Sequence, residues 1–207
     1  MIVTIVTGGE FINASLLFKY TKNADLLIGV DRGVEELLKS RITMDIAIGD
    51  FDSIENKELL QSDLVKEINK LNPIKDISDT HAAVEYAISK KPDKIYILNA
   101  TGTRMDHTLS NISLLKEISE KGIEAFIVDS HNRIRFAKKS NVIDKEYDYV
   151  SVIPLEENIK VSTIGFLYEV KDLELNYSQS RFLSNELKYD EATIDIEGRA
   201  LIIESRD

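Results

Sequence analysis

Two carboxylates stand two residues apart directly after an apolar run. Residues 46–53 read IAIGDFDS, so Asp50 and Asp52 follow Gly49. In an extended segment, side chains at positions i and i+2 point the same way, which would bring both carboxylates to one small volume. Like charges this close repel unless a proton or a cation lies between them, and Mg²⁺, which usually accompanies phosphates, is a suitable cation. An ordinary polar turn explains the same residues equally well.

Acidic turns recur after other apolar runs of the chain. Asp31 follows the run at 26–30, and Asp76 and Asp79 precede a segment with helical spacing. The run at 95–98 leads into NATGTRMDH at 99–107, which contains Asp106. Ligands of an open α/β sheet bind at the carboxyl ends of its strands. The repetition therefore indicates one shared site and favours the magnesium interpretation.

Segment 101–104 has the residue types that bind a polyphosphate. Gly102 permits a close backbone approach, Thr101 and Thr103 add hydroxyls, and a helix start follows. Arg104 would supply a bidentate fork for phosphate oxygens, although a solvated surface arginine is the simpler alternative. The chain contains neither a Walker A loop nor a Gly-x-Gly-x-x-Gly fingerprint, which argues against a P-loop enzyme and a Rossmann dehydrogenase.

The apolar pattern that must position these residues predicts an α/β domain, 1–130, followed by an all-β domain, 131–207. In the first domain, strands are expected at 2–7, 26–30, 46–48, 95–98 and 123–128, and helices at 14–20, 33–39, 56–69, 79–90 and 108–120. This alternation is typical of a Rossmann-like, doubly wound parallel sheet. In the second domain, strands are expected at 134–137, 147–153, 159–162, 166–170 and 173–177, with a hairpin of 193–196 and 200–203. A β-sandwich is the expected fold of this domain.

Bulk composition excludes several classes of protein. The 207 residues carry a net charge of −10, which argues against a nucleic-acid-binding protein because such a protein needs a basic face. The chain has no cysteine, which excludes disulfides and cysteine-ligated zinc and fits a reducing cytoplasm. We expect no secretory signal, because no basic segment precedes the first apolar residues, and no membrane span.

These motifs, in this order, resemble those of the thiamine pyrophosphokinase (thiamin diphosphokinase) family over nearly the whole chain. The matching residues are GDFDS at 49–53, Lys75-Asp76 with Asp79, then Gly102, Arg104, Asp106, His107 and Asn111, and finally SNE at 184–186 and EG at 197–198. The family's usual Asp-Gly-Gly is Asp31-Arg32-Gly33 here, so the chain departs from the family pattern at residue 32.

The resemblance implies an enzyme that transfers the diphosphoryl group of ATP to the hydroxyethyl oxygen of thiamine and releases AMP. Mg²⁺ would be held by Asp50, Asp52 and Asp79, and the catalytic group would also include Arg104 and Asp106. The further nucleotide-binding positions implied are Asp31, Ser53, Thr80, Thr101, Gly102, Thr103, His107 and Asn111. His107 could act as a general base, but we favour a role in orienting its neighbours. The sequence does not say which carboxylate would orient or deprotonate the alcohol.

The resemblance also implies a homodimer, with thiamine bound between the α/β domain of one subunit and the β domain of the other. Ser184, Asn185 and Glu186 would contact the aminopyrimidine. The family often stacks this ring on a tryptophan, and the chain has none, so Tyr168, Tyr177, Phe182 or Tyr189 would substitute. Two alternatives remain open: a diphosphokinase for another heterocyclic alcohol, such as a hydroxymethylpterin, and a non-catalytic nucleotide-sensing module.

Overall fold

The chain folds as two compact units, Met1–Ser130 and His131–Asp207. A computed structural model describes residues 1–52, 60–72 and 76–207. Ser53 and Lys75, which the sequence analysis singles out, lie outside the described residues. Each unit has an apolar core of its own. Within the described ranges, no helix combines the length and the apolar character that crossing a bilayer requires.

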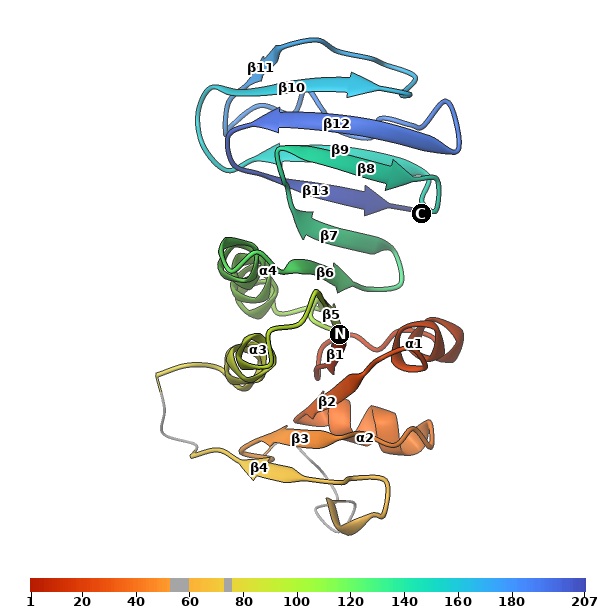
Figure 1. Ribbon diagram of the computed structural model, residues 1–207, viewed down its shortest axis with the longest axis vertical. Helices are drawn as coiled ribbons and strands as arrows, with labels where there is room; N and C mark the ends of the chain where they lie inside the picture. Colours follow the sequence, from red (N-terminus) through yellow and green to blue (C-terminus); the bar gives the residue numbers. More distant parts are fainter. Residues whose placement is uncertain (53–59, 73–75) are drawn as a thin grey trace. The chain divides into compact units, whose positions relative to one another are not determined.

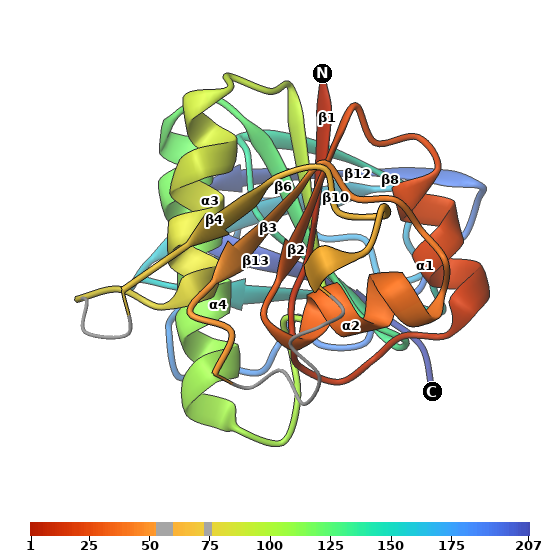
Figure 2. The ribbon, with the colours of Figure 1, turned by 90° about the horizontal axis from the view of Figure 1, so that it is seen from below.

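The first unit alternates strands with helices (Figure 1). Its elements are β1 (Ile2–Val6), α1 (Ala14–Thr21), β2 (Leu26–Val30), α2 (Arg32–Lys39), β3 (Ile46–Gly49), β4 (Ile68–Lys70), α3 (Asp79–Ser89), β5 (Lys94–Leu98), α4 (Met105–Glu120) and β6 (Glu124–Val128). The strands pair in parallel in the order β4-β3-β2-β1-β5-β6. Helices α1 and α2 cover one face of this sheet, and α3 and α4 cover the other (Figure 2). The fold is therefore doubly wound, as the alternation predicts, and its strand order reverses between β1 and β5.

The helix predicted at 56–69 is wrong for the part that the structure describes. Residues 60–72 contain no α-helix, and β4 extends the parallel sheet by pairing Ile68 with Ala47 of β3. Leu60 and Leu64, whose spacing suggested the helix, still pack against the core of the first unit. The spacing of these apolar residues indicates only that their side chains are buried. In this segment they reach the core without forming an α-helix.

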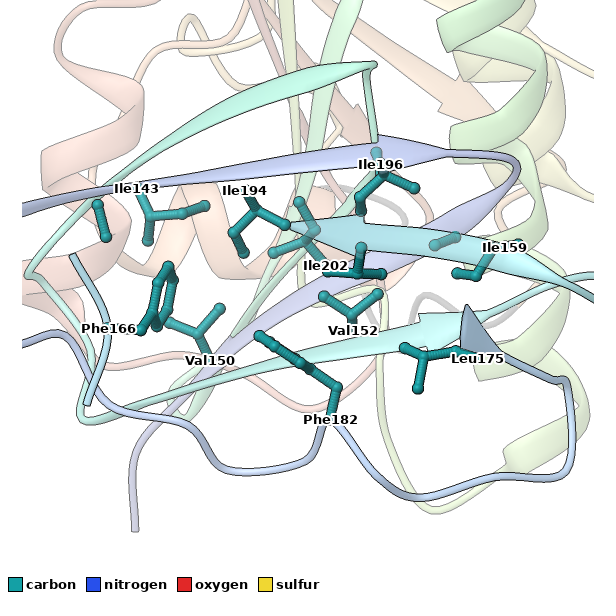
Figure 3. Packing of buried hydrophobic residues seen from close by; sticks show 14 of the residues in the cluster. Ile143, Val150, Val152, Ile159, Phe166, Leu175, Phe182, Ile194, Ile196 and Ile202 are labelled. Carbon is teal, nitrogen blue, oxygen red and sulfur yellow. The ribbon is translucent and has the colours of Figure 1, made fainter. Parts of the chain in front are cut away.

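The second unit is a β-sandwich, in agreement with the prediction. Its strands are β7 (Asn132–Phe136), β8 (Ser140–Asp144), β9 (Tyr149–Pro154), β10 (Ile159–Ile164), β11 (Leu173–Leu175), β12 (Glu191–Glu197) and β13 (Ala200–Ser205). Strands β7, β13 and β9 form one antiparallel layer, and β11, β10, β12 and β8 form the other. Side chains from both layers, such as Val152 and Ile194, meet in the core (Figure 3).

Three details of the second unit differ from the prediction. The hairpin of 193–196 and 200–203 is wrong, because β12 and β13 lie in different layers. The connection passes through Gly198, where a Cβ would lie 2.6 Å from a side-chain carbon of Ile159. The predicted strand at 166–170 is reduced to one isolated bridge, between Phe166 and Leu187, since Gly165 turns the chain at a φ of 88°. Strand β8 was not predicted.

Candidate active site

Three carboxylates converge at the carboxyl edge of the parallel sheet. Asp31 follows β2, Asp50 follows β3, and Asp79 is the first residue of α3. One carboxylate oxygen from each lies within 4.8 Å of the other two, and all three side chains are half-buried. We refer to Asp31, Asp50 and Asp79 as the acidic trio. Closely spaced carboxylate oxygens suit a hard divalent cation such as Mg²⁺.

Gly49 makes room for the Asp31 carboxylate. A Cβ at residue 49 would lie only 2.1 Å from Asp31 Oδ1. Asp31 itself has a φ of 48° and a ψ of −121°, a conformation that L-residues rarely adopt. Such backbone strain persists only where the surroundings enforce it, and it is concentrated at functional sites. The end of β3 thus helps to determine where the Asp31 carboxylate lies.

Asp52 lies outside the acidic trio. The chain turns immediately after Asp50, because Phe51 has a φ of 60° and its ring is buried. The backbone N–H of Asp52 donates to Asp50 Oδ1 at 2.9 Å, which closes an Asx turn, and the Asp52 side chain is exposed. Strand alternation therefore does not apply to Asp50 and Asp52, because the backbone at Phe51 is not extended.

The start of α3 presents Asp79 and Thr80 in its first turn. Ser78 caps the helix, with its hydroxyl accepting from the N–H of His81 at 3.2 Å. A carboxylate in this position is favoured by the helix dipole. Thr80 is half-buried, and Asp76 lies before the helix with an exposed side chain.

Side chains from neighbouring elements fix the backbone between β5 and α4. The amide of Asn111, which is buried on α4, donates to the carbonyl of Ala100 at 2.8 Å. The buried hydroxyl of Thr108 accepts from the N–H of Gly102 at 3.2 Å. Asn111 and Thr108 therefore shape the segment that contains the predicted phosphate-binding residues. Thr108 was not among the predicted site residues, because a threonine within a helix carries no distinguishing signal.

The Thr101 hydroxyl donates to Asp129 Oδ2 at 2.8 Å. Asp129 directly follows β6, so it joins the series of acidic residues at the carboxyl edge of the sheet. Asp129 was not among the predicted site residues, although it shows the same pattern of an apolar run followed by aspartate. The Thr101 side chain is thus held by the protein, while the exposed Thr103 side chain faces solvent.

Arg104 and Asp106 form an exposed bidentate ion pair. Arg104 Nη2 lies 2.5 Å from Asp106 Oδ2, and Nε lies 3.2 Å from Oδ1. Hydrogen bonds from Arg104 lower the pKa of Asp106 to about 2, and the pair raises the pKa of Arg104. Asp106 is not part of the acidic trio, and the neighbouring His107 is exposed. The carboxylate therefore orients the guanidinium fork at the start of α4.

The loop after β1 adjoins this segment at the point where the strand order reverses. The N–H of Gly9 donates to the carbonyl of Asn99, and that of Glu10 to the carbonyl of Thr101, each at 2.8 Å. A Cβ at Gly9 would lie 2.2 Å from the Asn99 carbonyl oxygen, so only glycine permits this contact. Open α/β sheets bind ligands at this kind of crevice.

In the second unit, the SNE triplet does not present all three side chains to solvent. Ser184 and Glu186 are exposed, but Asn185 is buried. The Asn185 amide donates to the carbonyl of Tyr168 at 2.8 Å, and its Oδ1 accepts from the N–H of Tyr168 at 3.2 Å and from that of Glu186 at 2.9 Å. Both ends of the amide are thus used within the protein.

The four aromatic candidates for ring stacking fall into two groups. Phe182 is buried and packs edge-on against Phe166, with ring centroids 6.3 Å apart, so it belongs to the sandwich core (Figure 3). Tyr168, Tyr177 and Tyr189 are exposed, and Tyr168 is the most exposed at 74%. Only the tyrosines are therefore accessible to a ligand.

Two family models match the chain in series. The thiamin pyrophosphokinase catalytic domain matches residues 17–127, and the thiamin pyrophosphokinase vitamin B1 binding domain matches residues 131–201. The chain belongs to the thiamin pyrophosphokinase family. All three residues of the acidic trio lie in the range of the first model, and Ser184, Asn185 and Glu186 lie in the range of the second.

Full-length relatives agree with this family. The thiamine pyrophosphokinase of Bacillus subtilis is 34% identical over 217 residues, which cover 99% of both chains. A crystal structure of thiamine pyrophosphokinase from Bacillus subtilis superposes over all of both chains with a TM-score of 0.91 and 31% identity. That of thiamin pyrophosphokinase from Geobacillus thermodenitrificans has a TM-score of 0.88 and 28% identity, covering 100% of this chain and 98% of that one. Both halves of a thiamin pyrophosphokinase are therefore present in this chain.

Proposed function

We propose that this thiamin pyrophosphokinase family member transfers the diphosphoryl group of ATP to the hydroxyethyl oxygen of thiamine, giving thiamine diphosphate and AMP. The observation that carries the proposal is the acidic trio, whose carboxylate oxygens lie within 4.8 Å of one another in the range that matches the family's catalytic domain. Transfer of a phosphoryl-type group depends mainly on positioning and on neutralising charge, and a cluster of metal-binding carboxylates serves both.

Asp31, Asp50 and Asp79 would hold Mg²⁺ in this reaction. Their oxygen donors, their half-buried setting and the space that Gly49 leaves for Asp31 fit a small divalent cation. When bound, the ion neutralises charge on the phosphate oxygens. Asp52, which is exposed beside the trio, remains a proposed further ligand.

Arg104 would bind phosphate oxygens of ATP. Its fork is already oriented by Asp106, and phosphate oxygens can compete for the same donors because the pair is exposed. Thr80, Thr101, Gly102, Thr103, His107 and Asn111 remain proposed nucleotide-site residues, together with Ser53, which lies outside the described residues. For Asn111 and Thr101, the hydrogen bonds to Ala100 and Asp129 support a positioning role.

The second unit would bind thiamine. Ser184 and Glu186 are exposed and offer polar groups to the aminopyrimidine, whereas Asn185 holds the backbone of Tyr168. We therefore place Tyr168 on the thiamine ring. We also propose a homodimer in which the second unit of one subunit completes the site of the other. Exposed Ile164 and Leu167 next to Tyr168 support a surface that is covered in the assembly.

The absence of cysteine supports the cytoplasm as the compartment. The activity is tested by incubating the purified chain with ATP, Mg²⁺ and thiamine and then separating the nucleotides and thiamine esters chromatographically. We expect AMP and thiamine diphosphate in equal amounts. AMP release with a hydroxymethylpterin but not with thiamine would overturn the acceptor, and no release with either would indicate a nucleotide-sensing module. Light scattering of the same sample tests the homodimer.

A further inference from the structure

Arg32 is next in sequence to a member of the acidic trio, and its side chain packs against the loop after β1. It directly follows Asp31 as the first residue of α2. A Cβ added to Gly8 would lie 3.0 Å from the Cβ of Arg32, so the arginine stem packs over the Gly8 backbone. The guanidinium carbon lies 5.4 Å from the centroid of the Phe11 ring, at cation–π distance. Two residues of the loop after β1 therefore hold this side chain.

The guanidinium of Arg32 is exposed, and in the part of the chain that the structure describes it makes no ion pair. This contrasts with Arg104, whose fork is bound to Asp106. An ion pair with a nearby carboxylate would stabilise an arginine in this position. Because Phe11 holds Arg32 instead, its N–H donors stay available for an anion from outside the protein.

The place of Arg32 in the fold indicates which anion this is. The Gly8–Gly9 turn leaves β1 where the strand order reverses, and it contacts both Arg32 and the segment after β5. A polyphosphate that reaches a cation held by the acidic trio at this edge brings more negative charge than one divalent ion neutralises. The additional positive charge has to come from side chains at the same edge.

We propose that Arg32 is a phosphate-binding residue of the nucleotide site, where its guanidinium donates to phosphate oxygens of ATP beside the Gly8–Gly9 turn. The inference rests on the proposed function in taking ATP as the nucleotide and the acidic trio as the place of its cation. It gives a role to the residue at which the chain departs from the family's Asp-Gly-Gly pattern.

The test is equilibrium binding of Mg·ATP, measured calorimetrically without thiamine so that no turnover occurs. Arg41 provides a matched control, because it is also an exposed arginine, it follows the other end of α2, and Arg41→Gln changes the net charge equally. We expect Arg32→Gln to raise the Kd for Mg·ATP about tenfold, the effect of one charge-assisted hydrogen bond, and Arg41→Gln to change it by less than about twofold. Arg32→Lys should give an intermediate value, because a lysine keeps the charge without the fork.

Equal effects of Arg32→Gln and Arg41→Gln would overturn the proposal, since binding would then depend only on net charge. No effect of either substitution would also overturn it, since neither arginine would then contribute to binding. Phe11→Leu tests the support: combined with Arg32→Gln it should weaken binding by less than the product of the two single effects, because the ring acts through the arginine. Multiplicative effects would contradict that arrangement. Failure of the wild-type chain to release AMP with thiamine would overturn the proposed function alone, because the binding comparison does not depend on turnover.

Discussion

One side chain, the amide of Asn185, bonds both backbone polar groups of Tyr168. Nδ2 donates to the Tyr168 carbonyl at 2.8 Å, and the Tyr168 N–H donates to Oδ1 at 3.2 Å. The backbone of Asn185 in turn pairs with Val150 of β9. The asparagine thus anchors an exposed tyrosine to the sandwich, and we propose that it positions this tyrosine in the thiamine site.

Replacing Asn185 by alanine should impair thiamine binding through Tyr168. The change leaves the N–H and the carbonyl of Tyr168 without the amide, and losing a part-buried hydrogen bond of this kind costs roughly 0.5–1.5 kcal/mol in the free energy of unfolding. Steady-state kinetics should show a raised KM for thiamine with the KM for ATP little changed. A change confined to the KM for ATP would contradict this division between the two units.

Tyr168→Ala should also raise the KM for thiamine, by a factor of about five, because aromatic stacking is worth on the order of 1 kcal/mol. Tyr168→Phe keeps the ring and should stay near the wild-type value. Tyr177→Ala is the matched control, since Tyr177 is similarly exposed but makes no hydrogen bond with the Asn185 side chain in the described structure. A larger effect at Tyr177 than at Tyr168 would assign the stacking ring to Tyr177.

Asp50→Asn should reduce turnover by several orders of magnitude, because a metal ion held there would contribute several kcal/mol to transition-state stabilisation by neutralising phosphate charge. Asp52→Asn should reduce it less, since the Asp52 carboxylate lies outside the trio and its backbone N–H is the group that contacts Asp50. Turnover numbers at saturating Mg²⁺, with circular dichroism as a check on folding, provide the comparison. Near-normal turnover of Asp50→Asn would remove it from the metal site.

Gly49→Ala should lower the affinity for Mg²⁺, because the added methyl group would lie 2.1 Å from Asp31 Oδ1 and must displace that carboxylate. The readout is the Mg²⁺ concentration that gives half-maximal rate. Gly122→Ala is the control: nothing lies within 4 Å of its Cβ position, and its φ of 77° imposes only a conformational cost. That variant should lose on the order of 1 kcal/mol of stability and keep its Mg²⁺ dependence. A parallel shift in both variants would mean that Gly49 acts through stability.

Arg104→Lys should lower kcat/KM for ATP by about tenfold or more, because an ammonium group cannot reproduce the bidentate fork. Since Arg104 holds the pKa of Asp106 at about 2, the carboxylate of the wild-type chain stays ionised as pH rises from about 4. A pH profile of kcat/KM should therefore show no step from Asp106 above that pH. Wild-type kinetics in the lysine variant would indicate that Arg104 is a solvated surface residue and does not bind phosphate.

The amino-acid sequence was sufficient to predict the doubly wound sheet, the sandwich and the strand ends that carry Asp31 and Asp50. Each of these depends on local patterns, because strands buried on both faces must be continuously apolar, and polar residues must begin where a strand leaves the core. Asp31 and Asp50 were singled out in this way, and parallel strands bring their own carboxyl ends to one edge. Asp79 was singled out by its place before a segment with helical spacing.

Tertiary structure alone decided the features that depend on a neighbour distant in sequence. The left-handed conformation of Phe51, whose ring fills the core, turns Asp52 out of the trio, and no periodicity shows this. The pattern of β12 and β13 is equally compatible with a hairpin and with a crossing between layers, and packing in the sandwich selects the crossing. The amide of Asn185 hydrogen-bonds to the backbone of Tyr168, 17 residues earlier, because a buried amide must satisfy its hydrogen bonds within the protein.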